Sequence, residues 1–182
     1  MLSTYWLPGK IENEKIIKVI RRDIFILFKK VLLFACLIIF PFLFFYLMLI
    51  KYPAFLVGEL SYPLIVLSSS AYYIFVWLFF FFSFIDYYLD VWIITNERII
   101  DIRQQGFFSR VISEQRLFRV QDVTSEVHGF FTTIFKYGDV YIQTAGSKQR
   151  FFFQEVPSPE EIRNIIIKLV ERNKEKYQVD NQ

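Results

Sequence analysis

The amino-acid sequence predicts a mixed α+β membrane protein. An amphipathic N-terminal helix and a hairpin of two transmembrane helices precede an antiparallel β-sandwich or open barrel closed by a C-terminal α-helix. Three observations lead to this fold class. Two long apolar runs lack charged residues, several short segments rich in β-branched residues follow, and an amphipathic segment with clear start signals ends the chain. Hydrophobic residues form 54% of the 182-residue chain, which also has 23 Phe and 11 Tyr, well above the usage of a water-soluble domain.

Residues 1–30 are expected to form a cytoplasmic amphipathic segment. Apolar residues such as Ile16, Ile20 and Ile24 recur at three- and four-residue spacing, as on one face of a helix. The other face carries basic residues, which are Lys15, Lys18, Arg22 and Lys29. Two interpretations stay open. The basic face contacts anionic lipid headgroups, or the apolar stripe packs on the cytoplasmic domain while the charges only set the topology.

Residues 31–85 are expected to form the transmembrane hairpin, with spans at 31–50 and 63–85. At 1.5 Å per residue the spans would be about 30 and 34 Å long, enough to cross a hydrocarbon core. Pro41 interrupts the first span and removes one backbone N–H, which membrane helices tolerate with a kink. Basic residues are concentrated before the first span, whereas the loop at 51–62 has one Lys and one Glu. The positive-inside rule therefore places both termini in the cytoplasm, with the chain integral to the cytoplasmic (inner) membrane.

Residues 86–182 are expected to form a cytoplasmic domain that begins with β-strands. The segment "DVWIITNERIIDI" predicts two strands joined by a turn at Asn96-Glu97, because Asn tolerates the left-handed conformation that a two-residue turn needs. Further strands are predicted in "SRVISEQ", "VQDVTSEVH", "GDVYIQTAG" and "RFFFQEV", with a bulge in the second of these and a turn at "GSKQ" before the last. The segment "GFFTTIFKYG" is predicted to be a helical turn that covers the sheet.

The predicted C-terminal helix spans residues 158–176. Ser158 is expected to be the N-cap, Pro159 suits the first helical position, and Glu161 completes a capping box. Its apolar stripe consists of Ile162, Ile165, Ile166, Leu169 and Val170. A stripe of this kind needs a sheet to cover.

Three motifs carry a resemblance to a known family. They are Ile-Thr-Asn-x-Arg at Ile94 to Arg98, Val-Gln-Asp-Val at Val120 to Val123, and Thr-Ala-Gly at 144–146. With the strand order, they resemble the bacterial pleckstrin-homology-like (PH-like) domain of the YdbS-like membrane protein family over about residues 87–177. The resemblance implies a PH-like β-sandwich or open barrel, and the two-span hairpin resembles the usual arrangement of that family. It supplies no catalytic residues, because the family has no established ones.

Phosphoinositide binding is disfavoured at one particular position. Many eukaryotic relatives of this fold bind phosphoinositides through a basic loop between their first two strands. Here that connection is expected to be only Asn96-Glu97, with Arg98 as the nearby cation, and a short acidic turn makes a poor phosphate site.

The sequence contains no set of residues that indicates catalysis, a metal or a cofactor. Its single histidine, His128, has no neighbouring metal-ligand pattern, and its single cysteine, Cys36, lies within the first span. A glycine-rich phosphate loop is also missing. An enzyme is therefore not expected. Acidic and basic residues nearly balance after residue 85, so a nucleic-acid partner is not expected either.

Two functions from different classes fit these observations. The first is a non-catalytic scaffold module at the inner face of the membrane, which recruits or organises protein partners, for example by adding a strand to an open sheet edge, or forms a homo-oligomer. The alternative is a protein that binds or handles anionic lipid. The possible headgroup contacts are Lys15, Lys18, Arg22, Lys29, Lys30, Arg98 and Arg103. The arginines among them can equally pair with neighbouring acidic side chains at the protein surface.

Overall fold

The computed structural model describes residues 9, 11, 13–52, 58–106, 109–144 and 151–179. The chain divides into two compact units, one formed by residues 24–85 and the other by residues 1–23 together with 86–182. The second unit, residues 1–23 and 86–182, is therefore discontinuous in sequence and is called the β domain. It contains seven strands in two sheets and a long C-terminal helix.

Two long helices form the unit of residues 24–85. Helix α1 spans Ile24–Lys51 and helix α3 spans Ser61–Leu89, and both are long and apolar enough to cross a membrane. The structure thus contains the two expected helices, each longer than its predicted span. Their contacts pair Phe34 with Phe80 and Phe42 with Tyr73, so the helices run antiparallel. Most of their large apolar side chains are exposed.

A hydrogen bond between the two helices meets the backbone defect caused by Pro41. In an α-helix the carbonyl of Leu37 would accept the N–H of residue 41, but proline has none. The hydroxyl of Tyr72 in α3 donates instead to the Leu37 carbonyl, at 2.9 Å. Next to it, Tyr73 donates to the Ile38 carbonyl at 3.3 Å. The second carbonyl does not depend on Tyr73, because the N–H of residue 42 is available to it.

The prediction of an N-terminal amphipathic helix is wrong for residues 16–21, which form a strand. Strand β1 spans Ile16–Arg21 and pairs antiparallel with β2. The pairing register shifts between Ile16 and Lys18, so Ile16 and Val19 pack on the same apolar cluster although they are three positions apart. An extra residue in a bulge interrupts the period of two, and the interrupted pattern imitates the spacing of a helix.

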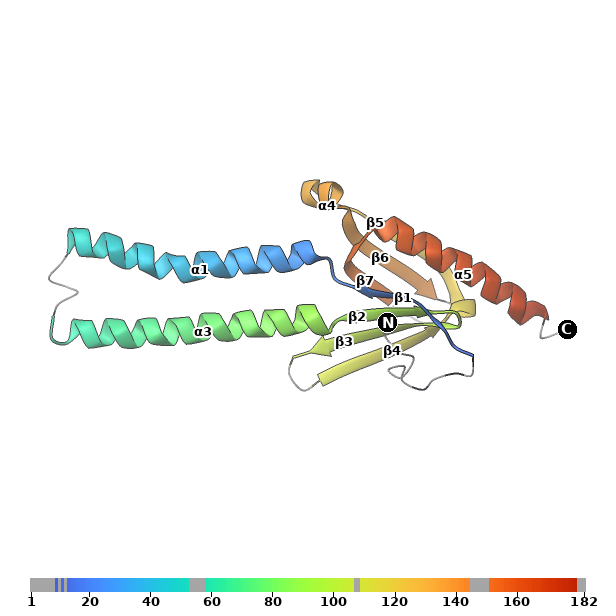
Figure 1. Cartoon of the computed structure of the whole chain (residues 1–182), viewed down its shortest axis with the longest axis horizontal. Helices are drawn as coiled ribbons and strands as arrows, with labels where there is room; N and C mark the ends of the chain where they lie inside the picture. The colour runs from blue at the N-terminus through green and yellow to red at the C-terminus, as the bar shows by residue number, and fades with distance from the viewer. Residues whose placement is uncertain are drawn as a thin grey trace. The chain divides into compact units, whose positions relative to one another are not determined.

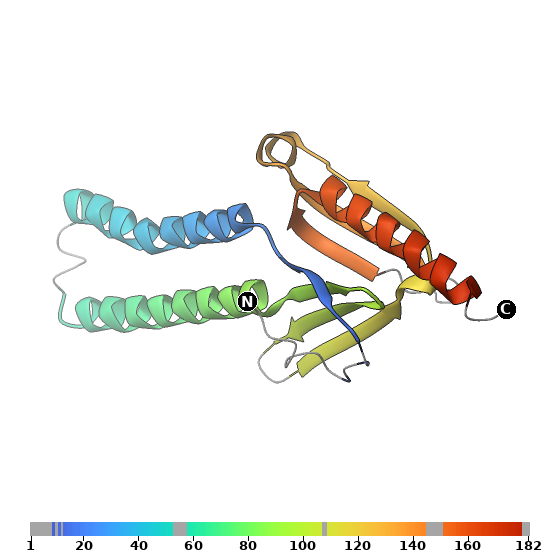
Figure 2. The ribbon, with the colours of Figure 1, turned by 45° about the vertical axis from the view of Figure 1, so that its right-hand side comes forward.

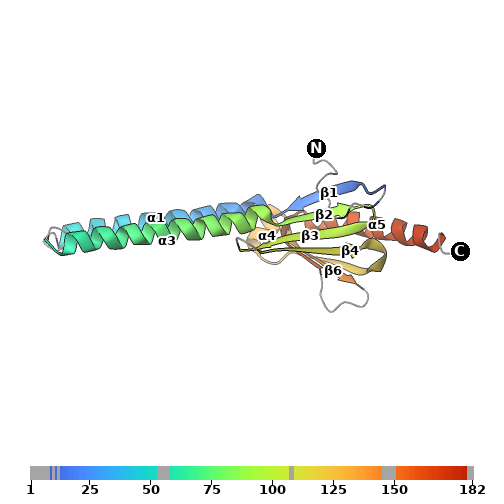
Figure 3. The same ribbon diagram turned by 90° about the horizontal axis from the view of Figure 1, so that it is seen from below.

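The first sheet has the strand order β1-β2-β3-β4, side by side in Figure 3. Strand β2 spans Val91–Thr95, β3 spans Arg98–Gln105 and β4 spans Ser109–Arg116. The turn at Asn96-Glu97 joins β2 to β3, as the sequence predicts. Strand β4 lies at the edge of this sheet and most of its side chains are exposed.

The second sheet has the order β5-β6-β7. A short 3-10 helix, η2 (Leu117–Arg119), leads into β5 (Val120–Glu126), followed by β6 (Tyr137–Thr144) and β7 (Phe151–Pro157). A register shift early in β5 confirms the predicted bulge. The turn predicted at residues 146–149 lies outside the described residues. Helix α4 (Phe130–Phe135) is helical as predicted, but it buries no side chain and so does not cover the sheet.

Helix α5 spans Pro159–Val179 and closes the core between the two sheets (Figures 1 and 2). The buried members of its apolar stripe are Ile162, Ile166 and Val170, and the cluster they join includes Trp92 of β2 and Phe153 of β7. The carbonyl of Ser158 accepts the N–H groups of Glu161 and Ile162 at its start. The sequence predicts that the Glu161 side chain completes a capping box. In the structure this side chain forms an ion pair with Lys18 at 2.6 Å.

The helical hairpin is inserted between the first two strands of the β domain. Residues 22–90 connect β1 to β2, and Arg21 still pairs with Val91 across this insertion. The turn at Asn96-Glu97 is consequently the second connection of the domain. The prediction that Asn96-Glu97 joins the first two strands is therefore wrong, because this turn joins β2 to β3. The connection between the first two strands is the helical hairpin.

The hydrogen bond at Pro41 gives a testable prediction. Tyr72→Phe removes the donor to the Leu37 carbonyl in apolar surroundings, and we expect it to destabilise the helical unit by about 1 kcal/mol. Tyr73→Phe is the matched control and should cost less. In a Pro41→Ala background the new N–H serves Leu37, so Tyr72→Phe should then cost much less. Unfolding of the purified full-length chain in mild detergent measures all four variants, and equal costs of Tyr72→Phe in both backgrounds would contradict the assignment.

Candidate ligand pocket beside Arg98

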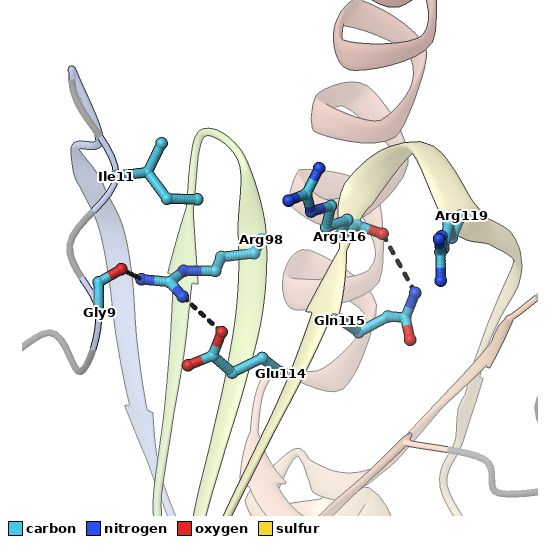
Figure 4. A pocket seen from close by; sticks show the side chains of 7 residues that line it. All are labelled: Gly9, Ile11, Arg98, Glu114, Gln115, Arg116 and Arg119. Atoms are coloured by element: carbon cyan, nitrogen blue, oxygen red, sulfur yellow. Dashed lines mark hydrogen bonds and ion pairs between the residues drawn. The ribbon is translucent and has the colours of Figure 1, made fainter.

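A pocket of about 570 Å³ lies on the outer face of the first sheet, at its β2–β3 turn end (Figure 4). Arg98 of β3 pairs in register with Arg116 of β4, and Ile100 pairs with Glu114. Side chains two residues apart point to the same face of a strand, so Arg98, Glu114 and Arg116 share this face. The pocket is lined by Gly9, Ile11, Arg98, Glu114, Gln115, Arg116 and Arg119.

Arg98 is held in an extensive network of hydrogen bonds. It is only 5% exposed. Its Nε donates to Glu14 Oε1 at 2.9 Å, and one terminal nitrogen donates to Glu14 Oε2 at 3.0 Å and to the Gly9 carbonyl at 2.8 Å. The other terminal nitrogen forms an ion pair with Glu114. Two carboxylates thus neutralise one guanidinium, and this part of the wall carries no net positive charge.

The pKa values of this pair reflect mutual stabilisation. Burial by itself would raise the pKa of Glu14, but the hydrogen bonds and positive charge of Arg98 hold it below the ordinary value. The hydrogen bond to Glu14 raises the pKa of Arg98, against the effect of burial. The pair is therefore ionised at neutral pH, and it ties the chain before β1 to the first sheet.

The opposite wall of the pocket carries positive charge from two exposed arginines. Arg116 ends β4 and Arg119 ends η2, and their guanidinium carbons lie 6.0 and 5.7 Å from the centre of the Phe118 ring. Cation–π contacts of this kind orient a guanidinium and leave its N–H donors available. Since Arg98 is already neutralised, Arg116 and Arg119 decide the charge that the pocket offers to a ligand.

The chemistry of the lining favours binding of an anionic group. Guanidinium groups bind carboxylates and phosphates through paired N–H donors. Neither a histidine nor a thiol is among the lining residues. In the part of the chain that the structure describes, no group of three or more His, Cys, Asp or Glu could hold a metal ion.

Comparison with known proteins identifies the family. The model of the bacterial PH domain family matches residues 25–170. The chain belongs to this family. Strand β1, at Ile16–Arg21, lies outside the matched range. A search of curated proteins finds no match.

A solved structure gives a weaker likeness to this bacterial PH domain. It is a DUF1696 family protein with a pleckstrin-homology domain from Shewanella loihica PV-4, at 17% sequence identity. The similarity covers 47% of this chain and 70% of that chain, with a TM-score of 0.35.

The residues expected to contact lipid headgroups are spread over the β domain and the helical unit. Lys18 pairs with Glu161, Arg22 pairs with Asp90 at 2.6 Å, and Arg98 is buried rather than at the surface.

The remaining members of that set also have interactions within the protein. Lys29 lies over the ring of Phe25, and Lys30 donates to the carbonyl of Ser83 at 3.1 Å. The backbone N–H of Lys15 donates to Asn96 Oδ1 at 2.7 Å, while the Lys15 residue is exposed.

Arg103, the last of the expected contacts, pairs with the buried Asp101 at 2.8 Å. Burial raises the pKa of Asp101, although Arg103 acts in the opposite direction. Arg103 thus offsets only part of the desolvation of this buried carboxyl group.

Sequence reasoning missed Glu14 as the partner of Arg98. The two residues are 84 positions apart, and the error over β1 concealed their proximity. Arg116 and Arg119 belong to the cluster of arginines visible in the sequence between Arg98 and Arg119. The sequence signal for the arginine wall of the pocket was Phe118, an aromatic residue between Arg116 and Arg119.

Removing the carboxylate of Glu14 should destabilise the β domain more than removing that of Glu114, the second partner of Arg98. We expect Glu14→Gln to cost about 3 kcal/mol, because it leaves the buried guanidinium incompletely compensated. Glu114→Gln is the matched control. The side chain of Glu114 is 39% exposed, so water can replace it and a smaller loss is expected.

The same pair predicts a dependence on pH. A carboxyl whose folded pKa lies below its ordinary value of 4.5 binds a proton less readily when folded than when unfolded. The stability it contributes is therefore complete above about pH 4.5 and is lost as the pH falls through the lower folded pKa. Glu14→Gln should flatten this loss of stability in acid. Unfolding curves between pH 3 and 7 measure it, and an unchanged slope would contradict the role of Glu14.

Proposed function

We propose that this chain is a non-catalytic, membrane-anchored PH-like binding module at the inner face of the cytoplasmic membrane, which recruits a protein partner. One observation carries the proposal: the apolar helical hairpin is inserted between two paired strands of the β domain. Both chain connections of the hairpin thus enter the sheet directly. A domain attached in this way is held at the membrane surface without a flexible linker.

Membrane anchoring is supported by the hairpin alone. Its helices have 28 and 29 residues, about 42 and 44 Å at the usual rise per residue, which exceeds a hydrocarbon core. Apolar side chains exposed over their length would be unfavourable in water and suit lipid. The basic residues before residue 31 favour a cytoplasmic location for the β domain.

The Arg116–Arg119 pocket is the proposed recruitment surface. Gln104, near the other end of β3, donates its N–H to Asp90, where the chain enters β2 from α3. Arg98 is six residues from Gln104, so the pocket lies about 20 Å from this junction. At that distance a membrane-attached headgroup is a poor ligand, and a carboxylate or phosphate group on a cytoplasmic protein is favoured.

The test uses charge reversal on the full-length chain. Arg116→Glu with Arg119→Glu should reduce the partner protein recovered by co-purification at least tenfold, since the pocket would then repel an anionic group. Lys168→Glu with Arg172→Glu is the matched control, because it makes the same charge change on exposed positions of α5. Equal recovery with both double variants would overturn the recruitment surface.

Anchoring and partner identity are tested separately. Alkaline extraction of native membranes should leave the full-length chain in the pellet, and release of the chain would overturn the anchoring. Native mass spectrometry from mild detergent should show a bound protein partner. A defined anionic lipid bound without a protein would instead favour the lipid-binding alternative.

A further inference from the structure

Helix α4 exposes large apolar side chains over much of their surface. Their exposed fractions are 74% for Phe130, 56% for Phe131, 55% for Ile134 and 48% for Phe135. Its six residues include no charged side chain. A helix this short is marginal in water by itself, and a helix that is apolar on most sides normally lies in apolar surroundings. An exposed apolar surface of this kind favours an apolar environment.

The polar side chains of α4 already have hydrogen-bond partners. Its two threonines, Thr132 and Thr133, donate their hydroxyl groups to the carbonyl of Gly129, at 2.5 and 2.9 Å. A hydroxyl that keeps a backbone hydrogen bond costs much less to remove from water than an unpaired one. Transfer of α4 into an apolar medium consequently meets little opposition from its side chains.

Helix α4 lies at the end of the β domain where the chain enters α1. It occupies the connection between β5 and β6, beyond the strand ends (Figure 1). Its C-cap residue, Lys136, accepts the N–H of Ser158 at 2.9 Å, and three residues earlier Glu155 accepts the N–H of Asp23 at 2.8 Å. Asp23 immediately precedes α1. Since three residues span at most about 11 Å, Lys136 lies within roughly 20 Å of the start of α1.

We propose that α4 inserts into the boundary between the headgroups and the acyl chains of the same membrane that holds α1 and α3. This inference rests on the membrane anchoring proposed above and adds a second contact of the β domain with the lipid. The occupant is lipid because the covalent junction keeps this end of the domain beside the bilayer. Short apolar helices bury their side chains at about this depth. Lys136 follows directly and suits the layer of anionic headgroups.

The test measures the depth of α4 in vesicles of phosphatidylethanolamine and phosphatidylglycerol that contain the full-length chain. Cys36, the single cysteine, is replaced by serine, and an environment-sensitive fluorophore is attached at Phe131→Cys. Lys174→Cys is the control, because Lys174 is exposed and its neighbour Asn173 donates to the Asn96 carbonyl at the opposite end of the domain. We expect nitroxide-labelled lipid to quench position 131 several-fold more than position 174, and aqueous iodide to quench it several-fold less.

Two further measurements separate the possible failures. Alkaline extraction of the same vesicles tests the anchoring: a chain that is retained while position 131 is as accessible to iodide as position 174 would overturn the α4 inference alone. Release of the chain would overturn both proposals. Disulfide cross-linking of two copies through Phe131→Cys would also overturn it, in favour of contact between copies.

A second variant guards against an effect of the label itself. With the fluorophore at Ile134→Cys, adding Phe131→Asp and Phe135→Asp should lower the nitroxide quenching to the level of position 174. Unchanged quenching would overturn the inference.

Discussion

The pairing of β1 with β2 is the constraint on which the rest of the structure depends. These strands are neighbours in the sheet although residues 22–90 separate them. Closing so long a connection costs entropy, but the antiparallel helices α1 and α3 return the chain to its starting point. At the junction, Arg22 pairs with Asp90 and lies 3.7 Å from Glu155 of β7, so one guanidinium connects both sheets where the hairpin enters. The β domain therefore contains residues from both sides of the insertion.

This arrangement gives the β domain two ends with different chemistry. The junction end carries the two chain connections and the apolar helix α4, and it suits a lipid surface. The other end carries the β2–β3 turn and the pocket with Arg116 and Arg119, and it suits an anionic group in water. Strand length sets the separation, because eight extended residues such as those of β3 span about 26 Å. The pocket and the chain connections to the hairpin therefore lie at opposite ends of the β domain.

The buried charged side chains of the β domain have partners of opposite charge, whereas several of its large apolar side chains are exposed. Arg98 and Glu14 are buried but matched, and Arg103 partly compensates the buried Asp101. A matched pair offsets much of its desolvation cost, so these charges are compatible with a stable core. The apolar side chains of α4, in contrast, stay largely exposed on the β domain. Arg98 and Arg103, named from the sequence as possible headgroup contacts, thus pair with acidic side chains of the β domain, and the proposed lipid contact of this domain lies at phenylalanines.

The sequence by itself determined the features that depend on local pattern. Uncharged runs predict the two long helices, the Asn96-Glu97 turn predicts the hairpin of β2 and β3, and the apolar stripe predicts the buried face of α5. Only the tertiary structure decided β1, the burial of Arg98 and the exposure of α4. A bulge gave β1 the spacing of a helix, and its pairing partner lies beyond the hairpin. Arg98 needed a carboxylate 84 positions away. Whether an apolar segment such as α4 is covered depends on which elements pack beside it, and no local pattern contains that information.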